Sequence, residues 1–166
     1  MKTKKNKDSL NIQGFYRLKI GEPDENGKVV KVAGDSGYQK NTVVNLGFQH
    51  YLVELLGAIS GSSAITFAAL GTGTGPGVTD TSLNGELGDA TNCRCAVTPT
   101  VVASKTLQCA FTLASGIVTA NRTIQNVGLF ATSTTAAGSM FAASTYATSQ
   151  LQTNQAVNGT YQIRFS

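Results

Sequence analysis

The sequence predicts a mainly β protein: an antiparallel β-sandwich of jelly-roll type with one short α-helix packed at an edge or end. Apolar and polar residues alternate in several short segments, which is typical of half-buried strands. Turn-forming residues separate these segments at short intervals. Only one stretch carries apolar residues at helical spacing. Such a pattern favours two packed sheets, with a small barrel as the alternative.

The N-terminal part predicts a hairpin. Residues 12–20 alternate, and residues 28–33 resume β character after a turn at 22–27 that contains Pro23, Asp24, Asn26 and Gly27. The residues expected on the buried face of the first strand are Ile12, Tyr16, Leu18 and Ile20.

The helix is predicted within residues 41–61. Its apolar residues recur at helical spacing, with Asn45 as the N-cap and Gly57 or Gly61 near the end. We expect this apolar stripe to cover an open end or face of the sheet. The stripe consists of Phe48, Leu52, Leu55, Leu56 and Ile59.

Residues 64–70 predict a short strand, and the glycine-rich segment 71–77 that follows predicts an exposed loop. Residues 79–87 predict a short helical or turn segment with Leu83 and Leu87 facing inward. Further antiparallel strands are expected at 106–113, 123–130, 139–146 and 157–165, with a small-residue turn at 131–138.

The chain divides into a basic N-terminal arm, residues 1–10, and one β-sandwich domain, residues 11–166. The arm carries Lys2, Lys4, Lys5 and Lys7, as much positive charge as the whole net charge of +4. The rest is therefore close to neutral, which does not favour nucleic acid as a partner. For the arm itself the sequence leaves open a contact with an acidic neighbouring subunit, a contact with nucleic acid, or a solvated tail.

Charged residues make up only 13% of the chain. That share is about half of the usual value. Neutral surfaces rich in small residues approach one another without desolvating charges, so this composition favours an assembly subunit. Polar residues interrupt the segment after the early lysines, and no apolar run is long enough to cross a membrane. We therefore expect neither secretion through a signal peptide nor insertion into a membrane.

No residue pattern points to catalysis, a metal or a cofactor. The single histidine, His50, has no partners at metal-ligand spacing, and Cys93, Cys95 and Cys109 are expected to be reduced, buried thiols. The carboxylates of Glu54, Asp80, Glu86 and Asp89 are explained by capping and solvation. The loop GTGTGPG lacks the Lys-Ser or Lys-Thr of a phosphate-binding loop.

Receptor or glycan binding is the main functional alternative. Exposed loops commonly carry recognition, and the candidate contact loop comprises Gly71, Thr72, Gly73, Thr74 and Gly75, with a second loop at 131–138. Sugar sites depend on exposed aromatic platforms. This chain has no tryptophan, and Tyr38, Tyr51, Tyr146 and Tyr161 mostly fall on faces expected to be buried.

Three stretches in order resemble a family of small structural proteins of tailed bacteriophages, described as tail-fibre or virion structural proteins. They are KNTVVNLGFQHYLVELLG (40–57), ITFAALGTGTGPGVTDTSLNGEL (65–87), and TIQNVGLF followed by GSMFAASTY and a last strand ending QIRFS. From the first to the last they span residues 40–166, roughly three quarters of the chain. The chain departs from the family at Asn126, where an acidic residue often precedes Val-Gly-Leu-Phe.

The resemblance implies a non-enzymatic structural component of a virion, made in the bacterial cytoplasm: tail, tail fibre, connector or capsid-decorating subunit. The expected partners are further copies of the chain, other virion proteins and, in the alternative, a host surface receptor. No cofactor is expected.

Overall fold

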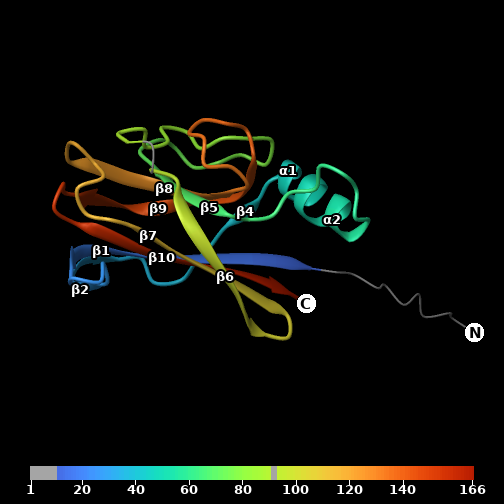
Figure 1. Cartoon of the computed structure of the whole chain (residues 1–166), viewed down its shortest axis with the longest axis horizontal. Helices are drawn as coiled ribbons and strands as arrows, with labels where there is room; N and C mark the ends of the chain where they lie inside the picture. Colours follow the sequence, from blue (N-terminus) through green and yellow to red (C-terminus); the bar gives the residue numbers. More distant parts are fainter. Residues whose placement is uncertain (1–10, 91–92) are drawn as a thin grey trace, which may run out of the picture.

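A computed structural model describes residues 11–90 and 93–166 of the chain. Its strands form a ten-stranded antiparallel sheet with the order β2-β1-β10-β7-β6-β5-β8-β9-β4, and β3 pairs with β1 (Figure 1). The strands are β1 (Ile12–Pro23), β2 (Val29–Asp35), β3 (Gln39–Lys40), β4 (Thr42–Val43), β5 (Phe67–Gly71), β6 (Cys95–Ala103), β7 (Thr106–Leu113), β8 (Arg122–Phe130), β9 (Met140–Leu151) and β10 (Ala156–Phe165). The prediction of a mainly β, antiparallel protein is confirmed.

The strands follow one hydrogen-bonded path rather than two separate sheets. β6 joins the two halves, because its first residues pair with β5 and the following ones pair with β7. Figure 1 shows β5, β8 and β9 above β1, β10 and β7, with β6 crossing between them. Residues 39–43 pair with β1 through β3 and with β9 through β4, so this short segment ties together strands that are far apart along the path.

The core lies between these strands and follows the alternation in the sequence. Tyr16, Leu18 and Ile20 of β1 are buried, as predicted. They belong to one apolar cluster with side chains of β8 and β9, such as Val127 and Phe141. Burial of this cluster holds the two halves of the path together, because apolar side chains are stabilised when they leave water and pack against one another.

The predicted hairpin at the N-terminus is confirmed by the pairing of β1 with β2. Its turn is stabilised by Asp24, whose carboxylate accepts hydrogen bonds from the N–H groups of Asn26 and Lys28, both at 2.9 Å. Side chains of aspartate commonly mimic a backbone turn in this way.

The helix occupies the predicted region, but its predicted orientation is wrong. It consists of α1 (Asn45–Phe48), a π-helical segment (Gln49–Val53) and α2 (Glu54–Leu56). The predicted N-cap is also wrong, since Val44 holds that position and Asn45 is already helical. The buried residues are Gly47 and Tyr51.

Most of the predicted apolar stripe of the helix points outward. Phe48, Leu55, Leu56 and Ile59 are 44%, 55%, 86% and 55% exposed. The reason is a close approach at Gly47, where an added Cβ would lie 2.1 Å from the carbonyl oxygen of Phe141. Only glycine lets the helix backbone rest on β9 there, and this contact fixes which side faces the sheet.

Residues 79–87 form turns rather than a helix. Leu83 and Leu87 nevertheless face inward, as predicted, with 5% and 3% of their surface exposed. The Asp80 carboxylate accepts a hydrogen bond from the Gly77 N–H at 2.8 Å, which closes a turn. A side chain bonded to its local backbone competes with helix formation, so the turn is the favoured local structure.

Candidate contact surfaces

The predicted contact loop is only partly exposed. Gly71 is the buried last residue of β5, Gly73 is half-buried, and Thr72, Thr74 and Gly75 are exposed. The loop pairs with the turn before Glu86, because the N–H groups of Thr72 and Gly73 donate to the carbonyls of Gly85 and Asn84 at 2.9 and 3.1 Å. This loop is therefore anchored at its base, and its polar tip faces outward.

Asn126 of β8 supports the same loop from below. Its Nδ2 lies 3.0 Å from the carbonyl oxygens of Gly73 and Thr74, and 2.9 Å from that of Asn84. The side chain is fully buried. The sequence alone assigned Asn126 no role, because β8 also contains Arg122, Thr123 and Gln125 and a further polar residue does not stand out there. Its burial is what requires partners for the side-chain amide.

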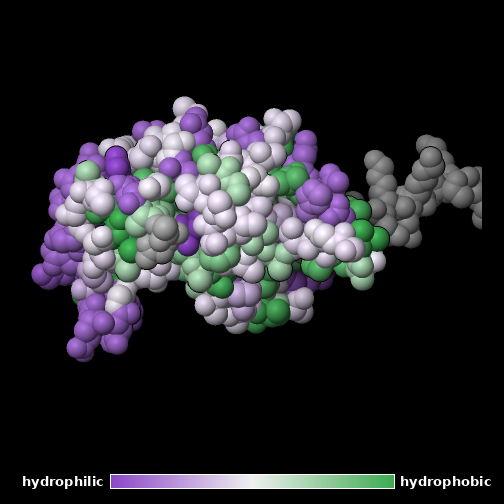
Figure 2. All heavy atoms as spheres, turned by 45° about the horizontal axis from the view of Figure 1, so that its top comes forward, coloured by the Kyte–Doolittle hydropathy of each residue, from purple (hydrophilic) through white to green (hydrophobic). Residues whose placement is uncertain are grey.

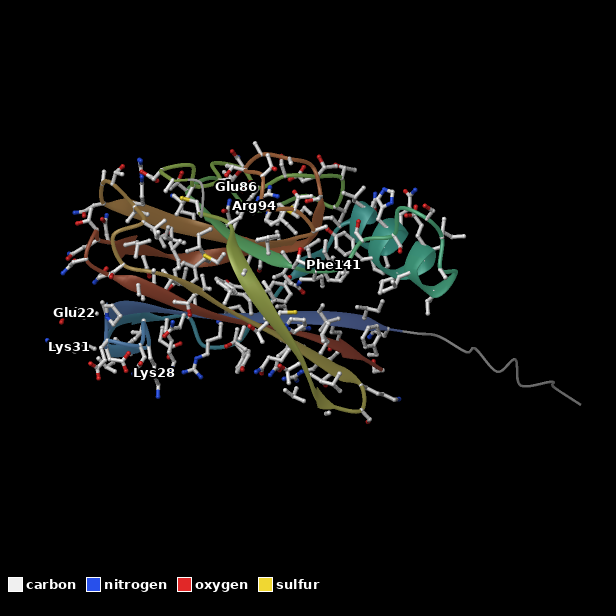
Figure 3. The ribbon with its side chains drawn as sticks, in the orientation of Figure 1. Glu22, Lys28, Lys31, Glu86, Arg94 and Phe141 are labelled. Carbon is white, nitrogen blue, oxygen red and sulfur yellow. The ribbon has the colours of Figure 1, made fainter. Side chains whose placement is uncertain are left out.

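A buried ion pair connects this region with the second predicted loop. Arg94 and Glu86 have only 0% and 3% of their side chains exposed, and Arg94 Nε donates to Glu86 Oε1 at 2.6 Å. Arg94 also donates to the carbonyls of Thr132 and Ala137 at 3.0 and 3.1 Å, and its guanidinium stacks 3.8 Å from the ring centre of Phe130. Figure 3 shows Glu86 and Arg94 side by side.

The structure thus places both predicted loops, 71–77 and 131–138, in one region of the molecule. The sequence prediction that solvation explains Glu86 is wrong: its carboxylate is buried, and it also accepts a hydrogen bond from the Ala136 N–H at 3.2 Å. The ion pair therefore holds the 131–138 loop against the segment around Glu86, and the backbone just before Glu86 in turn pairs with the 71–77 loop.

A polar hollow opens beside these loops. It has a volume of about 550 Å³, and the residues that line it include Thr79, Asp80, Thr81, Ser82 and Asn84. Its hydroxyl, amide and carboxylate groups fit a polar ligand. No aromatic ring is among its lining residues. Of the four tyrosines considered above, most are buried, as predicted, and Tyr38 is exposed, at 46%.

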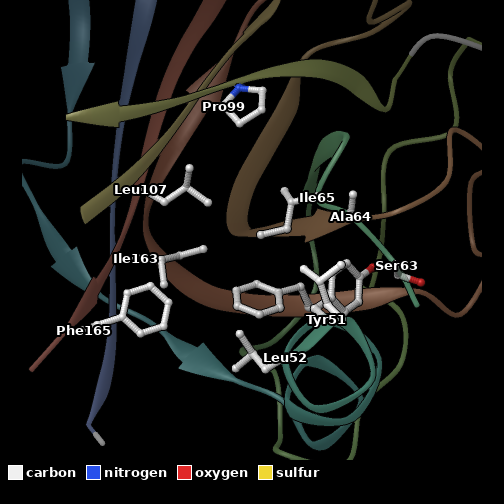
Figure 4. Close-up of a pocket in the computed structure, with 11 residues that line it drawn as sticks. Tyr51, Leu52, Ser63, Ala64, Ile65, Pro99, Leu107, Ile163 and Phe165 are labelled. Atoms are coloured by element: carbon white, nitrogen blue, oxygen red, sulfur yellow. The ribbon is translucent and has the colours of Figure 1, made fainter. Parts of the chain in front are cut away.

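A second hollow, in contrast, is apolar. It lies where the helix, the β6–β7 hairpin and the end of β10 meet, and its volume is about 300 Å³. Figure 4 shows Pro99 and Leu107 on one side and Tyr51 and Leu52 on another, with Ile163 between them and Phe165 at the edge. The other lining residues are Leu55, Ser63, Ala64, Ile65 and Phe141.

Several titratable side chains make structural contacts or are buried. His50 Nδ1 lies 2.7 Å from a Glu54 carboxylate oxygen, and Asp89 pairs with Arg122. All three cysteines are free and buried, as predicted, and burial raises the pKa of the Cys95 thiol to about 12. Such a thiol is protonated and unreactive at neutral pH.

Within residues 11–90 and 93–166, no group of three or more His, Cys, Asp or Glu side chains is arranged to hold a metal ion. No helix in the same ranges has the length and apolar character needed to cross a membrane. The predicted assembly arm, with Lys2, Lys4, Lys5 and Lys7, lies outside the described residues.

Comparisons of the chain with protein families, with curated proteins and with solved structures found no match.

Proposed function

We propose that this protein is a non-enzymatic structural subunit of a bacteriophage virion, in the tail, a tail fibre, a connector or a capsid decoration, and that it acts by associating with its own copies and with other virion proteins. The observation that carries the proposal is a cluster of exposed apolar side chains in a chain of low charge. Five of these side chains lie in or directly after the helix: Phe48, Val53, Leu55, Leu56 and Ile59.

Exposed apolar residues are common on any protein surface, but their concentration on one segment is informative. Leu56 is 86% exposed and Val53 is 66% exposed, and their neighbour Leu55 lines the apolar hollow. In Figure 2 hydrophobic side chains reach the surface at the helix end of the molecule, whereas the opposite end is mainly hydrophilic. Contact with another protein would remove this apolar surface from water.

We propose that the folded sheet is a β-sandwich of jelly-roll type, the arrangement in which such a subunit buries one face of each layer. The support is a contact across the core: the Tyr16 hydroxyl of β1 donates a hydrogen bond to the Thr145 carbonyl of β9.

The experiment that tests the structural role has two parts. Light scattering of the purified protein at two concentrations is expected to give a defined oligomer, and mass spectrometry of purified particles is expected to find the chain in them. Absence of the chain from particles that form normally would refute a virion role. Leu56→Ser should weaken association without unfolding the protein, because the side chain is exposed.

Receptor or glycan recognition is the second candidate, and the polar hollow beside the loops favours it. Thr72→Ala and Ser82→Ala remove hydroxyl groups from this region without touching its buried supports. If the loops recognise a host surface, these variants lose adsorption while the particles stay intact. If the loops serve assembly, the same variants yield fewer complete particles.

A further inference from the structure

We propose that two copies of this protein associate edge to edge through β6, which pairs antiparallel with the β6 of the second copy. This inference rests on the proposed function, because it names one surface, besides the apolar cluster of the helix, through which the subunit associates with itself. Three features of β6 support this pairing: its outer edge is unpaired, the edge carries no charge, and an apolar hollow lies beside it.

The outer edge of β6 has free main-chain groups. The Val97 N–H points away from β7, since it donates to the Thr66 carbonyl at 2.9 Å. In an antiparallel strand both main-chain groups of a residue point to the same side, and the side alternates along the strand. The groups of Pro99 and Val101 therefore also point outward, and beyond Val97 no strand of the described part of the chain pairs with this edge.

Pro99 agrees with this assignment and fixes the register. Proline has no N–H, so it is tolerated in a strand where that group would face solvent. Two β6 strands centred on Pro99 would lack both reciprocal hydrogen bonds. Centred on Val101, each copy donates its Val101 N–H to the Val101 carbonyl of the other, and the pair is symmetric about a two-fold axis.

The edge is also free of repulsion. Residues 95–121 contain a single charged side chain, Lys105, in the turn between β6 and β7. In the Val101 register the last β6 residues, Ala103 of each copy, are four strand positions apart, and each Lys105 lies beyond that end in its turn, so the two lysines are separated by more than roughly 13 Å. This exceeds the screening length of about 8 Å at physiological salt, so the two lysines do not oppose the contact.

The second exposed edge, on β2, is protected by comparison. Val30 and Val32 are exposed there, at 56% and 51%, but Lys31 lies between them and pairs with Glu22, and Lys28 precedes the strand. Figure 3 shows these charged side chains around the β1–β2 turn. Charged residues on an edge strand discourage pairing, whereas every residue of β6 from Thr98 to Ala103 is uncharged and exposed.

Apolar side chains beside the hollow would add to the main-chain pairing of the two β6 strands. Val101 lies opposite Leu107, so both side chains are on the same face of the sheet, and Leu107 lines the hollow. The Val101 of a second copy would sit beside the first one on that face, near the mouth of the hollow. Val101, which is 73% exposed in the single chain, becomes covered in both copies by the same contact.

Disulfide cross-linking tests this register. Directly opposed, hydrogen-bonded residues have Cα atoms about 5.5 Å apart, within the range that a disulfide bridges. Val101→Cys is expected to give a covalent dimer under mild oxidation, while the native cysteines stay buried and free. Val30→Cys, on the protected β2 edge, is the matched control. Equal cross-linking of the two variants, or none at Val101, would overturn the proposal.

Sedimentation equilibrium gives an independent measurement. Val101→Lys places two like charges at the two-fold axis and should weaken dimerisation at least tenfold, whereas Val30→Lys should leave it unchanged. A wild-type chain that is monomeric at all concentrations, or a Val101→Lys variant that dimerises as well as the wild type, contradicts edge pairing. The virion role is tested separately, by the presence of the chain in purified particles. Edge pairing can therefore be refuted while the virion role stands, and the reverse.

Discussion

Removing the charge of Glu86 should destabilise the protein more than any change to a surface ion pair. Arg94 has no exposed side-chain surface, and its guanidinium donates two hydrogen bonds to Glu86 and others to the Thr132 and Ala137 carbonyls. In Glu86→Gln the shape remains, but the buried guanidinium loses its carboxylate contact. Loss of one partner of a buried pair costs about 3–5 kcal/mol.

Equilibrium unfolding in urea measures this cost. With a slope of roughly 2 kcal/mol per M, the Glu86→Gln midpoint should fall by about 1.5–2.5 M. The control is Glu22→Gln, which breaks the Lys31–Glu22 pair, whose side chains are 78% and 51% exposed. Its effect should be under about 1 kcal/mol.

The double variant Glu86→Leu with Arg94→Met separates charge from packing. Apolar residues that replace both members of a buried pair often leave stability unchanged or raise it, so this variant should recover most of the stability that Glu86→Gln loses. If Glu86→Gln is no worse than the surface control, the pair is not desolvated in the folded protein, and the reasoning is wrong.

Single contacts lead to three more expectations. The Arg17 guanidinium lowers the pKa of Asp35 to about 2. The ionised Asp35 therefore contributes fully to the free energy of unfolding above its unfolded pKa of about 4, and this contribution disappears as the pH falls toward 2. In urea titrations, Asp35→Asn should abolish this part of the pH dependence of stability. Gly47→Ala should destabilise the protein by about 1–3 kcal/mol in the same assay, because the new Cβ meets the Phe141 carbonyl. The buried Cys95 thiol should react with a thiol reagent only after unfolding, and rapid labelling of the native protein would contradict its burial.

Strand alternation was the most reliable signal in this sequence. The strands β1, β7 and β10 were predicted, and so was the buried face of β1, because one wet and one dry side impose a period of two on the residues themselves. β6 was not singled out. Its residues are exposed on both sides over most of its length, so burial left no alternation to detect.

The candidate surfaces were predicted less well than the strands. The loop at 71–75 was recognised from its glycines, but its anchoring by Asn126 and the connection through Glu86 and Arg94 join residues that are distant in sequence. The apolar spacing of the helix was read correctly as helical. Its outward orientation was missed, because spacing alone does not tell which partner the stripe will contact.

Strand and helix types, the buried face of each long strand and the low charge of the surface were all readable from the sequence, because they follow from the local order of apolar, polar and turn-forming residues. Folding in three dimensions was needed to establish which side of the helix meets the sheet, which strand edge stays open and which charges become buried. These depend on close approaches between distant segments, such as Gly47 on Phe141 and Arg94 on the carbonyls of Thr132 and Ala137, where steric fit and desolvation act only once the chain has folded.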